Sequence, residues 1–255
     1  MWPYLGPVKT WDVLYTLSII SFFVVSRYYA RGLRLPRWSW ITLGIIYLVG
    51  MTVGAKVLFD LQHDQLSFLA LFTPDHWAAG GMWGGILAYL ALAVPAMLIL
   101  IPNKHTAIDF VALSLPIPLL LTKVGCLLNG CCYGTASTMP WALTFPEGAD
   151  TSTPGIPLHP TQIYEILVAV GIIIVFAVLD RKRWRGTMLF WFLAMYGLGR
   201  AATEVFRADL AERGLIIGPL SLSQVLCLAA AVVSTCVLVV WHKRHASSRA
   251  ENVSP

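Results

Sequence analysis

The hydrophobic pattern of the chain is a series of long, unbroken apolar runs separated by short polar stretches. The runs lack the two-residue alternation of transmembrane barrel strands, so they predict helices. A helix needs about 20 residues to span the hydrocarbon core of a bilayer. The pattern predicts an all-α polytopic membrane protein of about seven transmembrane helices, at residues 13–29, 39–59, 83–101, 108–121, 161–179, 187–205 and 220–241.

The composition excludes a soluble fold for these runs. Of the 255 residues, 57% are hydrophobic and only 12% are charged, whereas a soluble domain carries about 25% charged residues. Ten Trp and nine Tyr suit aromatic belts at the two faces of a bilayer. The net charge of +5 comes from short linkers and not from a basic patch with interleaved aromatic residues. We therefore expect a membrane environment and no nucleic-acid partner.

Basic residues predict the orientation of the chain in the membrane. Lys and Arg gather in alternate linkers, and cytoplasmic linkers carry the excess of these residues. With seven spans, this places the N-terminus outside and the C-terminus in the cytoplasm. The residues behind this prediction are Arg27, Arg31, Arg34, Arg37, Lys104, Arg181, Lys182, Arg183, Arg185, Lys243, Arg244 and Arg249.

The linkers are too short to hold a second domain, and no internal repeat is visible. We predict a single transmembrane domain over residues 1–255, with a membrane core over 10–244. Residues 131–160 are expected to form an outward-facing loop, and 245–255 a disordered cytoplasmic tail. The first residues lack a basic region and a cleavage site, so no removable signal peptide is expected.

A stripe of charged residues lies at the outer end of the sixth run. Arg200 and Glu204 are four residues apart and Arg207 follows three later, so they share one helix face. An ionisable group in the hydrocarbon region costs roughly 2.5–3.5 kcal/mol and survives where it faces a cavity or a partner. The guanidinium fork suits phosphate oxygens, and Glu204 would orient Arg200 or accept a proton. A structural ion pair between helices is the alternative.

A second polar cluster begins the fifth run. His159 precedes Pro160, which suits the first turn of a helix, and Gln162 and Glu165 are three residues apart on one face. His159 could act as a general base or donate to a phosphate. A capping and interfacial cluster is the alternative. The polar side chains of Gln162, Tyr164 and Glu165 on the same turn favour a functional site.

Two glycine-rich segments interrupt the apolar pattern. The segment from Lys123 to Gly134 contains three glycines and Asn129, and we expect re-entrant, non-helical backbone that forms a pocket wall. Lys123 would bring a further cation to this wall. In 80–85, glycines four residues apart favour close helix packing, with backbone approach to a ligand as the alternative.

Three of the five cysteines lie close together in the sequence. Cys126, Cys131 and Cys132 fall near the outer face, and their spacing is a poor match to a zinc site, so we expect no metal. A structural role is the first interpretation, and a disulfide and a reactive thiol favoured by nearby Lys123 both stay open. The other two, Cys227 and Cys236, are expected to be ordinary core residues.

Taken together, these motifs resemble those of the bacterial prolipoprotein diacylglyceryl transferases, in the family's order. The family's signature segment reads G-R-x-G-N-F-x-N-G-E-x-x-G, and its later motifs read H-P-[ST]-Q-L-Y-E, Y-G-x-x-R-x-x-x-E-x-x-R and S-x-G-Q. The resemblance covers most of residues 50–226. The matching segments here are 80–85, 123–134, 159–165, 196–207 and 223–224.

The resemblance implies a seven-span inner-membrane enzyme that moves diacylglyceryl from phosphatidylglycerol to the lipobox cysteine thiol of an exported prolipoprotein, releasing glycerol phosphate. It implies a site towards the periplasmic face of the bacterial inner (plasma) membrane, and we expect no cofactor. The expected catalytic residues are His159, Arg200, Glu204 and Lys123, and the expected substrate-binding residues are Asn129, Gly134, Gln162, Tyr164, Glu165 and Arg207.

The chain also departs from the family's pattern. Trp83 stands between Met82 and Gly84, where the family has a His before its second Gly-Gly, and the signature Arg, Asn and Glu are replaced by Lys123, Cys126 and Cys131. Two alternatives therefore stay open. One is a relative that moves a phospholipid-derived group to another thiol or other acceptor, with a cysteine as covalent nucleophile. The other is a non-enzymatic lipid-binding protein or carrier.

Overall fold

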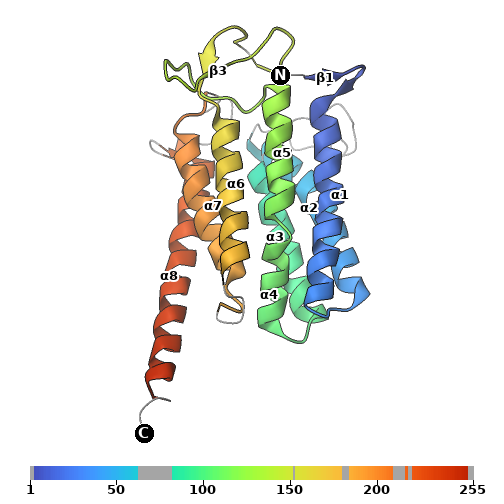
Figure 1. The fold of residues 1–255 in the computed structure, drawn as a ribbon, viewed down its shortest axis with the longest axis vertical. Helices are drawn as coiled ribbons and strands as arrows, with labels where there is room; N and C mark the ends of the chain where they lie inside the picture. The colour runs from blue at the N-terminus through green and yellow to red at the C-terminus, as the bar shows by residue number, and fades with distance from the viewer. Residues whose placement is uncertain are drawn as a thin grey trace.

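The computed structural model describes residues 3–62, 82–151, 153–179, 184–208, 216–217 and 220–251 as a bundle of long helices (Figure 1). This confirms the all-α membrane fold expected from the apolar runs. The helices are α1 (Thr10–Gly32), α2 (Arg37–Gln62), α3 (Met82–Leu100), α4 (Lys104–Leu113), α5 (Pro116–Asn129), α6 (Thr161–Val178), α7 (Met188–Glu204) and α8 (Leu222–Glu251).

Six helical spans in the described residues are long and apolar enough to cross a membrane. They are α1, α2, α3, the combined span Lys104–Asn129, α6 and the part Leu222–Arg244 of α8. The remaining predicted run is α7, which has 17 residues and packs against α6 and α8. A disordered tail was expected from residue 245, but the backbone of α8 stays helical as far as Glu251.

Within the described residues, three short two-stranded hairpins precede helices α1, α6 and α8. They pair β1 (Tyr4–Leu5) with β2 (Val8–Lys9), β3 (Leu143–Thr144) with β4 (Pro157–Leu158), and β5 (Ile216–Ile217) with β6 (Leu220–Ser221), all antiparallel. The first two lie at one end of the bundle, and α8 ends at the other (Figure 1). The loop over residues 131–160, expected to face outward, therefore covers the end remote from the C-terminus.

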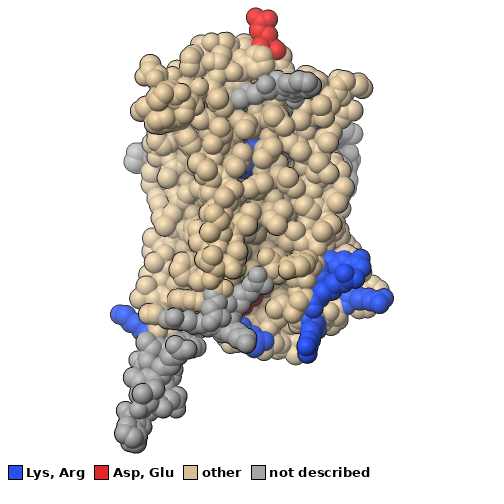
Figure 2. Space-filling view, viewed as in Figure 1, with Lys and Arg blue, Asp and Glu red and all other residues tan. Residues whose placement is uncertain are grey.

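Charged side chains are distributed unequally between the two ends. On the face shown in Figure 2, most of the visible Lys and Arg atoms lie at the end where α8 emerges, and an acidic side chain projects from the opposite end. This is the distribution on which the orientation prediction rests, and the orientation itself stays a prediction. Arg181, Lys182 and Arg183, which contributed to it, lie outside the described residues.

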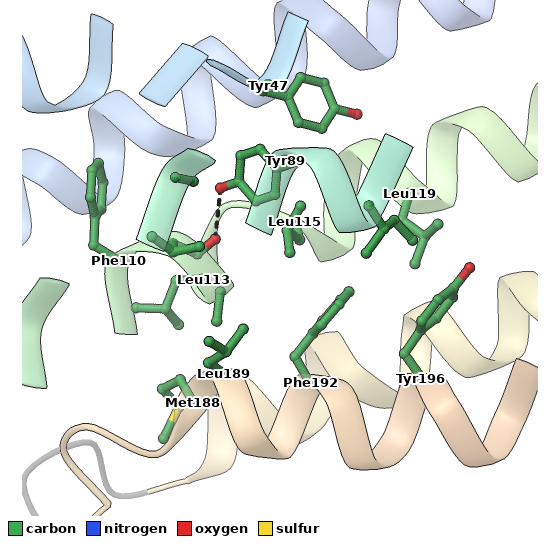
Figure 3. Packing of buried hydrophobic residues seen from close by; sticks show 14 of the residues in the cluster. Tyr47, Tyr89, Phe110, Leu113, Leu115, Leu119, Met188, Leu189, Phe192 and Tyr196 are labelled. Atoms are coloured by element: carbon green, nitrogen blue, oxygen red, sulfur yellow. Dashed lines mark hydrogen bonds between the residues drawn. The ribbon is translucent and has the colours of Figure 1, made fainter. Parts of the chain in front are cut away.

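The fourth predicted run, 108–121, is divided between α4 and α5. Asn103 caps α4 by accepting from the Thr106 backbone N–H at 3.0 Å, and Pro116 begins α5. Proline cannot donate a backbone hydrogen bond, so the helical ladder is interrupted here. The Tyr89 hydroxyl on α3 donates to the Val111 carbonyl at 3.1 Å (Figure 3), which satisfies an acceptor next to the break.

Replacing Tyr89 with phenylalanine is expected to destabilise the protein by about 1–3 kcal/mol, because the buried Val111 carbonyl loses its hydroxyl donor. Tyr89 is fully buried, so water cannot replace that donor. Thermal unfolding in detergent micelles should show a lower Tm. The matched control is Tyr28→Phe, since Tyr28 is 71% exposed. Equal Tm values for the two variants would contradict the expectation.

Glycines let α2 and α3 pack closely. A Cβ on Gly84 would collide with the Gly54 carbonyl and with Leu58, and one on Gly85 would lie 3.0 Å from the Met51 carbonyl oxygen. The packing interpretation of the 80–85 segment is therefore confirmed for its last two glycines, in agreement with small-residue packing in membranes. The first two residues of that segment lie outside the described residues.

The expected re-entrant segment after Lys123 is wrong. Helix α5 continues without interruption to Asn129. Gly125 serves instead to bring α5 close to α1, because a Cβ there would lie 3.1 Å from the Leu14 Cβ. Gly130 ends the helix with φ of +83°, a left-handed conformation that glycine adopts without steric cost.

Candidate active site

A cluster of buried charged side chains lies where three helices meet, near the end covered by the outer loop. Lys123 comes from the second half of α5, Glu165 from the second turn of α6, and Arg200 from the end of α7. Glu204 ends α7, and Arg207 follows it. Each of these residues is at most 5% exposed. The structure thus joins residues predicted from three separate motifs.

Glu165 is the centre of this cluster. Its Oε2 lies 2.7 Å from the Lys123 Nζ. Its Oε1 lies 3.7 Å from an Nη1 atom of each of two arginines, Arg200 and Arg207. One carboxylate therefore holds three cations together, and burial strengthens each interaction because little water screens it.

Glu204 is the second carboxylate of the cluster. It forms an ion pair with Arg200, one helical turn earlier on α7. It also accepts a hydrogen bond from the Ser221 hydroxyl at 3.1 Å. Ser221 in turn accepts from the Gln224 backbone N–H at 3.1 Å and donates its own N–H to the Gln224 side chain at 3.0 Å. The start of α8 therefore fixes the carboxylate that orients Arg200.

Arg200 keeps unused hydrogen-bonding capacity. Its Nε–H has no hydrogen-bond partner within the part of the chain that the structure describes. Only 5% of the side chain is exposed, so this donor is buried. Burying such a donor without an acceptor costs free energy. Among the described residues, the three cations of the cluster, set against its two carboxylates, leave one net positive charge. An anion that approached Arg200 would therefore meet both an open donor and a favourable charge.

The Gly134 backbone holds Arg207 in place. Gly134 forms a β-bridge with Arg207 and donates its N–H to the His159 carbonyl at 2.9 Å. A Cβ on Gly134 would lie 2.6 Å from the His159 Cβ and 2.6 Å from the Phe206 carbonyl oxygen. A glycine is therefore required where these three segments meet. Gly134 acts in the structure as a packing position for the segment that carries Arg207.

His159 belongs to an aromatic group beside the charged cluster. Its Nδ1 lies 3.1 Å from the Tyr164 hydroxyl, which also accepts from the Trp141 indole N–H at 2.8 Å. The His159 ring packs against Phe206 at 4.8 Å between centroids. Tyr164 thus faces His159, whereas Glu165, its neighbour in sequence, faces the cations. The structure separates these two predicted site residues into adjacent groups.

The remaining predicted polar residues hold the outer loop. The Gln162 side chain donates to the Cys131 carbonyl at 2.8 Å. The Asn129 side-chain amide donates to the Asp150 carboxylate at 3.2 Å, and the Asp150 N–H donates to the Asn129 carbonyl at 2.9 Å. Both residues therefore fix loop backbone or loop side chains in this structure.

The sulfurs of Cys126, Cys131 and Cys132 all lie within 4.8 Å of one another, and all three are free thiols. Hydrogen bonds from Cys126 and Cys131, followed by the nearby Arg207 and Lys123, hold the pKa of the Cys132 thiol well below its usual range. The three sulfurs meet because the chain reverses direction after α5, at the left-handed Gly130. Cys227 is buried as expected, whereas Cys236 is exposed and is not a core residue.

Sequence reasoning missed two further buried charges on α2. Lys56 and Asp60 are 4% and 5% exposed, and within the described residues the Lys56 Nζ and one Asp60 carboxylate oxygen have no hydrogen-bond partner. They lie four residues apart, near the same end of the bundle as the hairpins. An ionisable residue inside an apolar run is itself a signal of function. Lys56 carried that signal within the predicted span 39–59.

The chain belongs to the prolipoprotein diacylglyceryl transferase family, whose model matches residues 4–241. The match therefore includes all the helices that supply the buried charges. The resemblance inferred from the short motifs is confirmed.

Relatives named phosphatidylglycerol–prolipoprotein diacylglyceryl transferase align with nearly the whole chain. The protein from Geobacter sulfurreducens is 28% identical over 92% of both chains. That from Solidesulfovibrio magneticus is 30% identical over 92% of this chain and 91% of its own. That from Idiomarina loihiensis is 30% identical over 88% of this chain and 86% of its own.

Proposed function

We propose that this protein transfers diacylglyceryl from phosphatidylglycerol to the lipobox cysteine thiol of exported prolipoproteins. The observation that carries the proposal is the open Nε–H of buried Arg200, inside a cluster with one net positive charge. A lipid phosphodiester supplies one negative charge and several acceptor oxygens, so it complements both features. Membership of the family and the names of the relatives support the same substrates.

Arg200 and Arg207 share one role in the proposed reaction, the stabilisation of the leaving group. The acceptor sulfur attacks the terminal glyceryl carbon of the donor, the bond from that carbon to the phosphate oxygen breaks, and glycerol phosphate leaves with the electron pair. Charge grows on the departing phosphate, where Arg200 and Arg207 would stabilise it. Glu165 and Glu204 position these guanidinium groups through the ion pairs described above.

His159 is the proposed acceptor of the thiol proton. The contact between its Nδ1 and the Tyr164 hydroxyl orients the ring, which leaves Nε2 for a substrate. A neutral imidazole nitrogen can accept a proton as a general base. Lys123, bound to Glu165 at 2.7 Å, would add positive charge beside the leaving group.

The proposed location is the bacterial inner membrane, with the site towards the periplasmic face. The clustering of Lys and Arg at the end where α8 emerges (Figure 2) supports a cytoplasmic C-terminus. The buried charged cluster lies near the opposite end, under the loop over residues 131–160. A site at that depth would meet both a lipid headgroup and an exported precursor.

The assay that tests this function uses the purified protein in vesicles of phosphatidylglycerol with a synthetic lipobox peptide. We expect release of glycerol phosphate together with a mass increase of the peptide equal to one diacylglyceryl group. Vesicles of phosphatidylcholine serve as the donor control and should give neither product. A peptide whose mass stays unchanged with phosphatidylglycerol would contradict the proposal, whatever lipid the protein binds.

A further inference from the structure

The three clustered cysteines are brought together by an unusual backbone path. Cys126 lies in the last turn of α5, and Gly130 ends that helix in a left-handed conformation. Cys132 then adopts a φ of +63°, which is rare and costs free energy for a residue with a side chain. Such conformations persist where the surrounding structure imposes them, often at ligand clamps. The reversal returns two thiols over the helix end, towards the first.

Helix α6 holds this arrangement from the opposite side. The Gln162 amide donates to the Cys131 carbonyl at 2.8 Å, and the Thr161 hydroxyl donates to the Cys132 carbonyl. Both donors come from the first turn of α6, and both are fully buried. The backbone of the two adjacent cysteines is therefore fixed before any ligand arrives, which lowers the cost of binding.

Cations lie close to the three sulfurs. Lys123 lies about one helical turn before Cys126 on α5, and Arg207 pairs with Gly134, two residues after Cys132. Both cations belong to the buried charged cluster. Three thiolates around a divalent ion would carry one net negative charge. Lys123 and Arg207 would lie beside that charge, so the complex would not stand as an isolated anion in a buried place, and the positive charge of the cluster would be shared between the metal site and the donor phosphate.

We infer that Cys126, Cys131 and Cys132 bind one thiophilic metal ion of the Zn²⁺ type and leave a fourth coordination position open for the acceptor thiol. Zinc–sulfur bonds of about 2.3 Å place tetrahedral sulfur ligands roughly 3.8 Å apart. The sulfurs here lie within 4.8 Å, so small side-chain rotations would complete the shell. Catalytic zinc sites characteristically have three protein ligands and one exchangeable position.

The role of the open position rests on the proposed function. The acceptor thiol would bind the metal as a thiolate, because coordination favours loss of its proton, and the proton would pass to His159. The sulfur would then form its bond to the glyceryl carbon as the carbon–oxygen bond to phosphate breaks. The metal keeps its oxidation state throughout. The product is a thioether, a weaker ligand than a thiolate, and so it would leave the metal.

Metal content is the direct test and needs no turnover. The full-length protein is loaded with Zn²⁺ in detergent, desalted and measured by elemental mass spectrometry. We expect about one zinc per chain, lost in the variant C126S/C131S/C132S and kept in the control Cys236→Ser, which changes an exposed thiol. Circular dichroism and gel filtration verify that the triple variant is folded. The single variant Cys132→Ala provides the same test with less perturbation.

X-ray absorption then tests the geometry. Zinc should show three sulfur neighbours at about 2.3 Å, and four after addition of a lipobox peptide. Equal zinc content in the folded triple variant and the native protein, or a disulfide among the three cysteines in the metal-treated protein, would overturn the site. An unchanged number of sulfur neighbours after addition of the peptide would overturn the open position.

The two proposals can fail separately. Transfer by a zinc-free protein would refute the metal's role and leave the proposed function standing. A zinc site in a protein that transfers nothing would contradict the proposed function and leave the metal site itself standing.

Discussion

Replacing Arg200 with lysine is expected to lower kcat/KM for diacylglyceryl transfer on the order of 10²–10³-fold, the usual cost of removing one charge-stabilising donor. Lysine keeps the positive charge but loses the planar fork and the Nε–H, which has no hydrogen-bond partner among the described residues. It is therefore not a conservative change at a phosphate site. Because the donor contributes most when charge grows on the departing phosphate, the loss should fall mainly on kcat.

The matched control for this variant is Arg27→Lys. This variant makes the same substitution at an exposed position. The Arg27 guanidinium lies over the Trp40 ring, 5.6 Å from the ring centroid. Glycerol phosphate release from phosphatidylglycerol vesicles measures both variants. If Arg200→Lys and Arg27→Lys keep equal kcat/KM values, Arg200 does not bind the donor phosphate.

Replacing Glu165 with glutamine is expected to destabilise the fold by about 3–5 kcal/mol, the cost of removing one partner from a buried ion pair. Glu165 faces Lys123, Arg200 and Arg207, so the change leaves three buried cations with Glu204 as their one remaining carboxylate in the cluster. Like-charge repulsion should then lower the Tm measured in detergent micelles. Transferase activity should fall with it, since the guanidinium groups lose their shared anchor.

Glu147→Gln is the control for this loss of a carboxylate. Glu147 lies exposed in the outer loop, where solvent screens its charge and the expected change in stability is small. A second variant, Glu165→Asp, keeps the charge and shortens the side chain. It should recover part of the stability lost in Glu165→Gln. A glutamine variant as stable as the native protein would show that the cluster does not depend on Glu165.

The sequence predicted much of the fold because bilayer thickness imposes a length on every apolar run. It also predicted the stripe on α7, since Arg200 and Glu204 lie one helical turn apart and their pairing is local. The central position of Glu165 was not predictable in the same way. That residue shared a motif with His159 and Tyr164, and only the rotation of α6 decides which side chain faces the cations.

The failures of prediction have a common physical origin in the chain between α4 and the outer loop. Glycines were interpreted as interruptions of helical structure, but Gly125 serves the approach of α5 to α1. The approach of the three cysteine side chains could not be predicted from their spacing either, because it depends on positive φ angles at Gly130 and Cys132. Side-chain contacts from α6 impose that path, and such contacts cannot be recognised in a linear motif.

If Arg207 binds the donor phosphate as proposed, the β-bridge between Gly134 and Arg207 would link lipid binding to the position of the outer loop. Arg207 lies beyond the end of α7, so its guanidinium is located partly by the loop strand and not by a helix alone. A donor phosphate that favours one placement of Arg207 must favour the matching loop conformation. By reciprocity, a precursor that stabilises that conformation raises the affinity for the donor by the same factor. This one β-bridge would therefore make binding of the two substrates cooperative, in addition to the contact between the acceptor sulfur and the donor carbon.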